Sequence, residues 1–191
     1  KGIKVANGEY LLFLNSGDWF VDSQVVKKFI DFKPKDDIVY GDSLVEENGS
    51  LKRKNMPSKM NVAKALTHTI THQCIFYKQT IFQDNTRYDT GYKIVADWVL
   101  TTTAIIYKNA STRYINIPIC VFNLEGISSN KKARVAERER FFDNNLSLLS
   151  KKILKDYINL NNEYNYLKNN SLFKLVLLLR KIRCKILNTF K

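Results

Sequence analysis

Residues 8–18 (GEYLLFLNSGD) decide the fold class of this chain. The apolar run at residues 10–14 is typical of a strand that is buried on both faces of a parallel sheet. The run stops at Asn15-Ser16-Gly17-Asp18, whose residue types favour a tight turn. We therefore expect a buried parallel strand that ends in a polar turn.

Predicted strands and helices alternate along the sequence that follows. We expect helices over residues 23–32, 62–66 and 97–107, and strands at 38–40, 74–77 and 114–122, the last interrupted by Pro118. Asn48-Gly49, between apolar residues, indicates a β-hairpin. This alternation, with polar residues after the strands, predicts an α/β domain whose site lies at the carboxyl ends of the strands.

The composition indicates a folded protein of a reducing compartment. Of the 191 residues, 45% are hydrophobic and 12% are aromatic, which argues against disorder. The three cysteines lie far apart and are odd in number, which favours a reduced cytosolic protein over a disulfide scaffold or a zinc cluster. The longest apolar stretch, residues 175–179, is too short to span a bilayer. We therefore expect a cytoplasmic location.

The first residues predict that the chain is a fragment. It begins with Lys1 rather than Met, and residues 1–8 (KGIKVANG) are typical of the end of a helix that is already under way. We therefore expect the chain to be a fragment of a longer protein.

The net charge of +13 is distributed unevenly. Residues 1–50 hold more acids than bases, whereas residues 164–191 hold seven bases and no acid. A nucleic-acid-binding protein would explain a high positive charge, but no nucleic-acid-binding motif is apparent. Residues 172–187 form an amphipathic pattern with Lys174, Lys181 and Lys185 on one stripe. This pattern predicts either a helix that packs on its own domain or attachment to an anionic membrane surface.

The turn at residues 15–18 is the first candidate site. A carboxylate such as Asp18 at the end of a strand can bind a divalent cation, while Gly17 lets the backbone approach a phosphate. The same residue types also suit an ordinary turn in which Asp18 caps the next helix. The turn alone leaves both interpretations open.

Asp97 and the pair His72-Gln73 are the other candidates. Asp97 lies at the start of an apolar helix, where a carboxylate that faces a pocket can act as a general base. The helix dipole favours an acid at the same position without any catalytic role. His68 and His72 are four residues apart, but no third ligand follows at a metal-binding spacing. We expect His72 and Gln73 to line a pocket or to satisfy nearby backbone groups.

The order of these motifs resembles that of family-2 glycosyltransferases. The motifs are residues 8–18, Tyr40-Gly41-Asp42, His72-Gln73, Tyr88-Asp89, Ala96-Asp97-Trp98 and Gly126-Ile127-Ser128. They are most similar to the bacterial polysaccharide-synthesis branch, which carries Leu-Asn-Ser-Gly-Asp where other members have Asp-x-Asp. The resemblance covers residues 1–130.

The resemblance implies a GT-A-like (Rossmann-like) mixed sheet flanked by helices, which lacks its first strands here. Residues 1–130 would be the metal and acceptor side of this domain, and residues 131–191 a helical, basic extension. The family binds nucleoside-diphosphate-sugars with Mg²⁺ or Mn²⁺. Because its strands that hold the nucleotide would precede Lys1, we expect the isolated chain to be inactive.

The resemblance also implies roles for residues. The family's metal-binding motif falls on Asn15, Ser16, Gly17 and Asp18, with Asp18 as the one carboxylate, and its catalytic base falls on Asp97. We expect the acceptor pocket to include Asp42, His72, Gln73 and Trp98. The implied reaction glycosylates a saccharide or lipid-linked acceptor with inversion, in bacterial surface polysaccharide synthesis at the inner face of the plasma membrane. A nucleotidyltransferase of similar fold and a basic nucleic-acid-binding protein are the alternatives.

Overall fold

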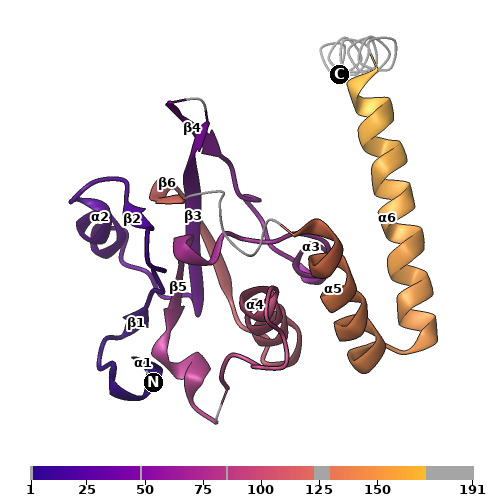
Figure 1. Cartoon of the computed structure of the whole chain (residues 1–191), viewed down its shortest axis with the longest axis horizontal. Coiled ribbons are helices and arrows are strands. Elements are labelled where there is room, and N and C mark those ends of the chain that lie inside the picture. Colours follow the sequence, from indigo (N-terminus) through magenta and orange to yellow (C-terminus); the bar gives the residue numbers. More distant parts are fainter. Residues whose placement is uncertain (1, 48, 85, 123–129, 171–191) are drawn as a thin grey trace, which may run out of the picture. The chain divides into compact units, whose positions relative to one another are not determined.

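The computed structural model describes residues 2–47, 49–84, 86–122 and 130–170, and the chain divides into two compact units, residues 1–141 and 142–191 (Figure 1). The strands are β1 (Tyr10–Leu11), β2 (Trp19–Phe20), β3 (Ile38–Glu47), β4 (Ser50–Lys54), β5 (Ile75–Lys78) and β6 (Thr112–Phe122). The helices are α1 (Gly2–Val5), α2 (Val25–Asp31), α3 (Val62–Thr67), α4 (Ala96–Tyr107), α5 (Lys131–Asn145) and α6 (Leu148–Asn169), with 3₁₀ turns η1 (His72–Cys74) and η2 (Gln79–Phe82).

The strands of the first unit form one mixed sheet in the order β1-β5-β3-β6-β2, and β4 extends it as a hairpin partner of β3. Among the described pairings, β3 and β6 are parallel and the other pairs are antiparallel. The hairpin confirms the turn predicted at residues 48–49, where Gly49 has a φ of 74°. A mixed sheet flanked by helices is the α/β fold class that the sequence predicts.

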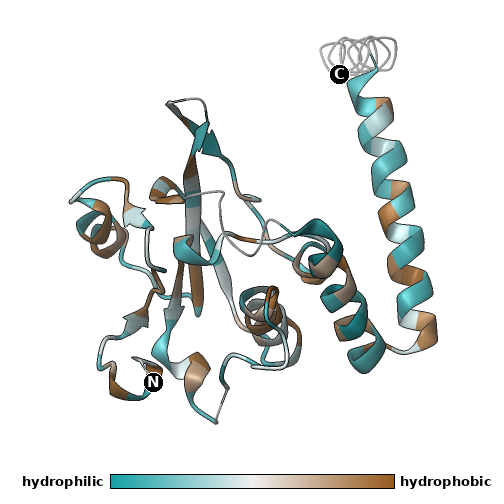
Figure 2. Ribbon diagram, viewed as in Figure 1, coloured by the Kyte–Doolittle hydropathy of each residue, from teal (hydrophilic) through white to brown (hydrophobic). Residues whose placement is uncertain are grey.

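Hydrophobic cores lie on both faces of the sheet, because side chains alternate along each central strand. Tyr40 of β3 belongs to a core cluster that includes Leu100 of α4. The neighbouring Val39 belongs to a second cluster, which includes Phe29 of α2. Hydrophobic residues accordingly occur on β3, α2 and α4 (Figure 2).

The apolar run at residues 10–14 is not the parallel strand that the sequence predicts. Strand β1 is two residues long and pairs antiparallel with β5 at one end of the sheet. Phe13 lies beyond the strand and packs edge-to-face against the rings of Tyr77, Phe82 and Tyr88. Aromatic packing explains the hydrophobic run, and the sequence pattern does not distinguish it from burial within a parallel sheet.

A bulge interrupts the parallel pairing of β3 with β6. The register shifts at Asp42, which pairs with Pro118 of β6. Proline cannot donate to a ladder, and a bulge is one of the places where a strand accepts it. A Cβ at Gly41 would lie 2.5 Å from the carbonyl oxygen of Ile117, so the strands approach closely here because residue 41 is glycine.

Asp42 is a buried anchor of the sheet. Its side chain is fully buried. One carboxylate oxygen accepts the backbone N–H of Met56 at 2.7 Å, and the other accepts Arg53 Nε and the Tyr114 hydroxyl, each at 2.8 Å. Asp42, which the sequence predicts to be an acceptor-pocket residue, is therefore buried within the fold and does not line the cleft that contains residues 15–18.

Helix α5 begins where the sequence predicts a separate extension, but its first part belongs to the α/β unit. The carboxylate of Glu137 accepts the backbone N–H groups of residues 93–95 at 2.8 to 3.0 Å. Partial desolvation opposes ionisation, but these three donors outweigh it and lower the pKa of Glu137. Phe141 is buried and packs edge-on against Trp98. Because of these contacts the unit extends to Phe141, beyond the boundary predicted at residue 130.

The second unit contains the end of α5 and α6. The Ser147 hydroxyl caps α6 by accepting the backbone N–H of Ser150 at 3.1 Å. Hydrophobic and hydrophilic residues are interspersed along α6 (Figure 2). Among the described helices, none combines the length and apolarity that crossing a membrane requires. The amphipathic helix predicted at residues 172–187 lies outside the described residues.

Replacing Asp42 with alanine is expected to destabilise the protein by about 3 kcal/mol, because Arg53 and the N–H of Met56 lose a buried acceptor. Asp22→Ala is the matched control, since Asp22 forms an exposed ion pair with Lys28 and such pairs add little stability. Urea unfolding followed by tryptophan fluorescence compares the two variants. Equal unfolding midpoints would show that Asp42 contributes no more than a surface acid.

Glu137→Gln is expected to loosen the segment that leads into α4, because a neutral amide has one acceptor oxygen in place of a charged carboxylate. Hydrogen exchange at the backbone amides of residues 93–95 should become at least roughly tenfold faster. Glu139→Gln, at an exposed position of the same helix, is the control and should leave these amides unchanged. Equal exchange in both variants would contradict the bracing role of Glu137.

Candidate active site

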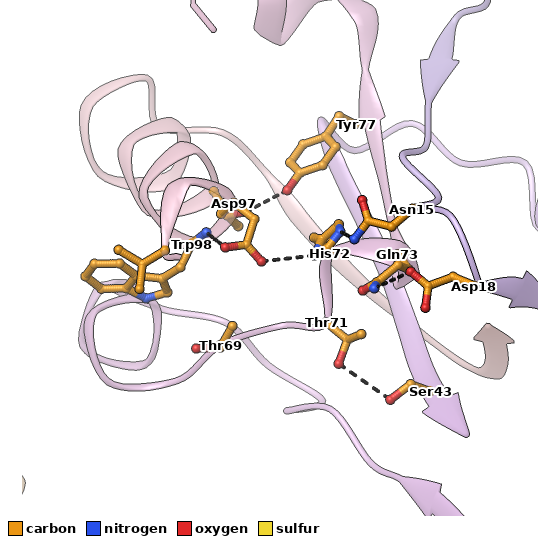
Figure 3. Close-up of polar contacts among 12 residues, drawn as sticks. Asn15, Asp18, Ser43, Thr69, Thr71, His72, Gln73, Tyr77, Asp97 and Trp98 are labelled. Carbon is orange, nitrogen blue, oxygen red and sulfur yellow. Dashed lines mark hydrogen bonds and ion pairs between the residues drawn. The ribbon is translucent and has the colours of Figure 1, made fainter. Parts of the chain in front are cut away.

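One cleft of the α/β unit gathers most of the residues predicted from the sequence (Figure 3). Its volume is about 860 Å³. Residues 15–18, residues 71–73 and residues 93–98 line it, together with single residues from β4, β6 and α5. The cleft therefore combines segments that are far apart in the chain.

The turn at residues 15–18 has the geometry that its sequence predicts. The N–H of Asp18 donates to the carbonyl of Asn15 at 3.1 Å, which closes a β-turn. Gly17 has a φ of 88°, and no atom of the described residues lies within 4 Å of the Cβ that another residue would carry. Glycine is therefore needed for the backbone angle and not for space. All four residues, Ser16 included, line the cleft.

Side chains of the 3₁₀ turn η1 contact both the turn at residues 15–18 and the helix α4. Its last residue, Cys74, is fully buried, and its thiol lies 3.1 Å from that of Cys120. The hydrogen bond with Cys120 and the burial both raise the pKa of the Cys74 thiol. The two preceding side chains reach the cleft, where Gln73 Nε2 donates to Asp18 Oδ2 at 2.7 Å.

Asp97 lies in the first turn of α4 and lines the cleft. Its Oδ2 lies 3.0 Å from His72 Nδ1, and its Oδ1 accepts the backbone N–H of Trp98 at 2.7 Å. The side chains of His72 and Asp97 are each 21% exposed, so the carboxylate is anchored and still reachable. A general base requires this combination of access and fixed orientation.

Trp98 forms part of the cleft wall but is 3% exposed. Its indole N–H donates to the carbonyl of Ala65 at 2.8 Å, and the guanidinium of Arg138 lies 4.3 Å from the ring centroid. Trp98 therefore packs α3, α4 and α5 together. It lines the cleft, and its indole N–H is engaged within the protein.

Sequence reasoning missed the basic side of the cleft. Three basic residues and two acids line it, namely Lys54, Lys93, Arg134, Asp18 and Asp97. This excess of positive charge suits an anionic ligand. Tyr88 also lines the cleft, and burial, followed by the charge of Asp97, raises the pKa of its hydroxyl.

Arg134 was missed because it lies on α5, in the part of the chain expected to be a separate extension. Arg134, Arg138 and Phe141 recur at the spacing of one helical face. That spacing was the available signal for a helix that packs on the domain, but the high charge of the segment masked it.

A divalent cation would find one carboxylate at the turn, that of Asp18. In the described part of the chain, no three His, Cys, Asp or Glu side chains form a cluster that could hold a metal. Asp18 Oδ2 accepts from Gln73, which leaves further lone pairs on the carboxylate. Mg²⁺ needs one or two protein carboxylates when phosphates supply other ligands. The carboxylate of Asp18 is thus suited to a hard cation that takes most of its other ligands from elsewhere.

A second hollow, of about 650 Å³, lies beside α2 and differs from the cleft in chemistry. Apart from Glu9 and Lys33, its lining is uncharged and largely apolar. His68 does not line the cleft. Its Nδ1 lies 2.8 Å from the hydroxyl oxygen of Thr67. Of these two hollows, the first cleft has more ionisable side chains in its lining.

Comparison with known proteins gives relatives but no family model. No protein-family model matches the chain. Two proteins named "PGL/p-HBAD biosynthesis glycosyltransferase", from Mycobacterium bovis and Mycobacterium tuberculosis, are each 26% identical over 138 residues, which is 68% of this chain and 51% of the relative. The chain spans about half the length of these curated relatives. Among solved structures, TarS 1-349 of S. aureus matches with a TM-score of 0.49 and 16% identity, over 78% of this chain and 54% of that chain.

The matched region covers most of the chain, and the cleft unites the turn at residues 15–18, η1 and the first turn of α4. These are the motifs on which the resemblance was based. This chain is therefore similar to proteins that are named as glycosyltransferases, and its mixed sheet flanked by helices belongs to the α/β class.

Proposed function

We propose that the protein containing this chain transfers a sugar from a nucleoside-diphosphate-sugar to a hydroxyl group. The observation that carries the proposal is the anchored carboxylate of Asp97, which shares one cleft with Asp18 and three basic residues. A hydroxyl acceptor needs such a carboxylate to remove its proton. The relatives named as glycosyltransferases support the same reaction class.

Asp97 is the proposed general base of a single displacement. The acceptor oxygen attacks the anomeric carbon while the bond from this carbon to the diphosphate breaks. The acceptor proton passes to Asp97, and the electron pair of the broken bond leaves with the nucleoside diphosphate. One displacement inverts the configuration at the anomeric carbon, because no side chain forms an intermediate with the sugar.

The basic residues of the cleft support the binding of an anionic donor. Lys54 of β4, Lys93 of the segment before α4 and Arg134 of α5 line the same space as Asp18. Their charges attract a diphosphate and stabilise it as it departs. Asp18 would hold Mg²⁺ or Mn²⁺, which would supply Lewis-acid stabilisation of the leaving group.

We infer that the acceptor is a saccharide or lipid-linked molecule of surface-glycan synthesis. The mycobacterial relatives are named for PGL/p-HBAD biosynthesis, which supports a role in glycan assembly. The basic residues 164–191 suit an anionic membrane surface. The protein would then act at the cytoplasmic face of the plasma membrane.

In the full-length enzyme, Asp97→Asn is expected to lower turnover by roughly 10²–10⁴-fold, because an amide cannot take the acceptor proton. Turnover is measured as the release of nucleoside diphosphate from UDP-, GDP- and dTDP-sugars with saccharide acceptors. Asp89→Asn is the matched control, since Asp89 is exposed, accepts the N–H of Gly91 and lies outside the cleft lining. Near-normal turnover by a folded Asp97→Asn enzyme would remove the assignment.

Asp18→Ala is expected to weaken the binding of a nucleoside diphosphate and its dependence on Mn²⁺ together, by at least roughly tenfold. The physical reason is the loss of the one carboxylate at the turn. Calorimetric titration of UDP and GDP into the full-length protein, with and without Mn²⁺, measures both quantities. Asp22→Ala removes an acid outside the cleft lining and serves as the control. If Asp18→Ala kept Mn²⁺-dependent binding, the cation would have to bind elsewhere.

A further inference from the structure

Asn15, His72 and Asp97 form a chain of side-chain contacts across the cleft (Figure 3). Asn15 Nδ2 lies 3.0 Å from His72 Nε2, and His72 Nδ1 lies 3.0 Å from Asp97 Oδ2. The three residues belong to the turn at residues 15–18, to η1 and to α4. Both nitrogens of the imidazole are therefore engaged.

The chemistry of the two partners fixes where the imidazole carries its hydrogen. An amide nitrogen donates hydrogen bonds and does not accept them. His72 Nε2 must then accept from Asn15 with its lone pair. The hydrogen of the neutral ring resides on Nδ1, from which it is donated to the carboxylate of Asp97.

We propose that Asn15 is a positioning residue that holds His72 in the Nδ1–H tautomer, so that His72 serves as a fixed hydrogen-bond donor to Asp97 and not as a base itself. The proposal rests on the proposed function, in which Asp97 is the base. It gives Asn15 a task separate from the cation and diphosphate assigned to the rest of its turn.

The contact with Asn15 decides which group of the pair receives the proton. In a carboxylate–imidazole pair such as that of the serine proteases, the carboxylate orients the ring and the far ring nitrogen takes the proton. Here Asn15 covers that far nitrogen. Asp97 is meanwhile held at Oδ1 by the N–H of Trp98 and at Oδ2 by His72. The remaining lone pairs of Asp97 are thus the basic positions that the pair offers to an acceptor.

The tautomer is tested directly by NMR on the full-length protein labelled with ¹⁵N-histidine, without any substrate. At neutral pH the His72 ring should show a protonated Nδ1 and an unprotonated Nε2 that accepts a hydrogen bond, and Asn15→Ala should shift the Nε2 resonance. His72→Asn identifies the signals, and His68→Asn is the control. A ring protonated at Nε2, a cationic ring, or an Nε2 resonance unchanged in Asn15→Ala would overturn the proposal.

Turnover separates a donor role of His72 from a base role. An asparagine amide can place its N–H near the position of imidazole Nδ1 but cannot accept a proton there. His72→Asn should therefore stay within about tenfold of wild type, whereas His72→Ala, which frees the carboxylate to rotate, should lose about 10²-fold. Equal, severe losses in both variants would make His72 the base and overturn the proposal.

The NMR and turnover experiments test the tautomer of His72 and the proposed function separately. Turnover is followed with UDP-glucose, UDP-N-acetylglucosamine, GDP-mannose and dTDP-rhamnose as donors. If wild type releases no nucleoside diphosphate from any of them, the proposed function is contradicted for these donors. The NMR result still decides whether Asn15 fixes the tautomer of His72.

Discussion

The burial of Cys74 at the end of η1 is the constraint on which the candidate site depends. Its thiol lies 3.2 Å from the backbone carbonyl of Asp42 and 3.1 Å from the thiol of Cys120, inside the core. This anchor ties a three-residue turn to the sheet, so that the two side chains before Cys74 reach the cleft. His72 then meets Asp97 while Gln73 meets Asp18, and acids from distant parts of the sequence share one space.

Asp42 extends the same constraint into the rest of the fold. Its backbone supports η1, and its carboxylate connects β3 with β4, β6 and the segment after β4. The bulge opposite Gly41 lets β6 approach closely enough for these contacts. The Tyr40-Gly41-Asp42 motif therefore has a physical reason that involves no ligand: it builds the support beneath the cleft.

Contiguous patterns allowed most of the site to be predicted from the sequence. The turn at residues 15–18 and Asp97 at the start of α4 each depend on local residue types, and the structure places both in the cleft. Asp42 could not be assigned in this way, because a polar residue within a strand looks the same whether it faces a core or a cleft. The contact of Glu137 with residues 93–95 joins distant segments, so no local pattern reveals it.

The partners of the three acids separate structural from chemical roles. Asp42 is fully buried and pairs with the guanidinium of Arg53. This pairing offsets the charge of the carboxylate and leaves it inaccessible to a ligand. Asp18 and Asp97 are held instead by the amide of Gln73 and the imidazole of His72. The amide of Gln73 is a neutral donor, and so is the imidazole of His72 in the proposed Nδ1–H tautomer. Such a donor orients a carboxylate without cancelling its charge, so the carboxylate can still attract a cation or a proton. On this physical ground, the two acids of the cleft are suited to chemistry and the buried acid to support.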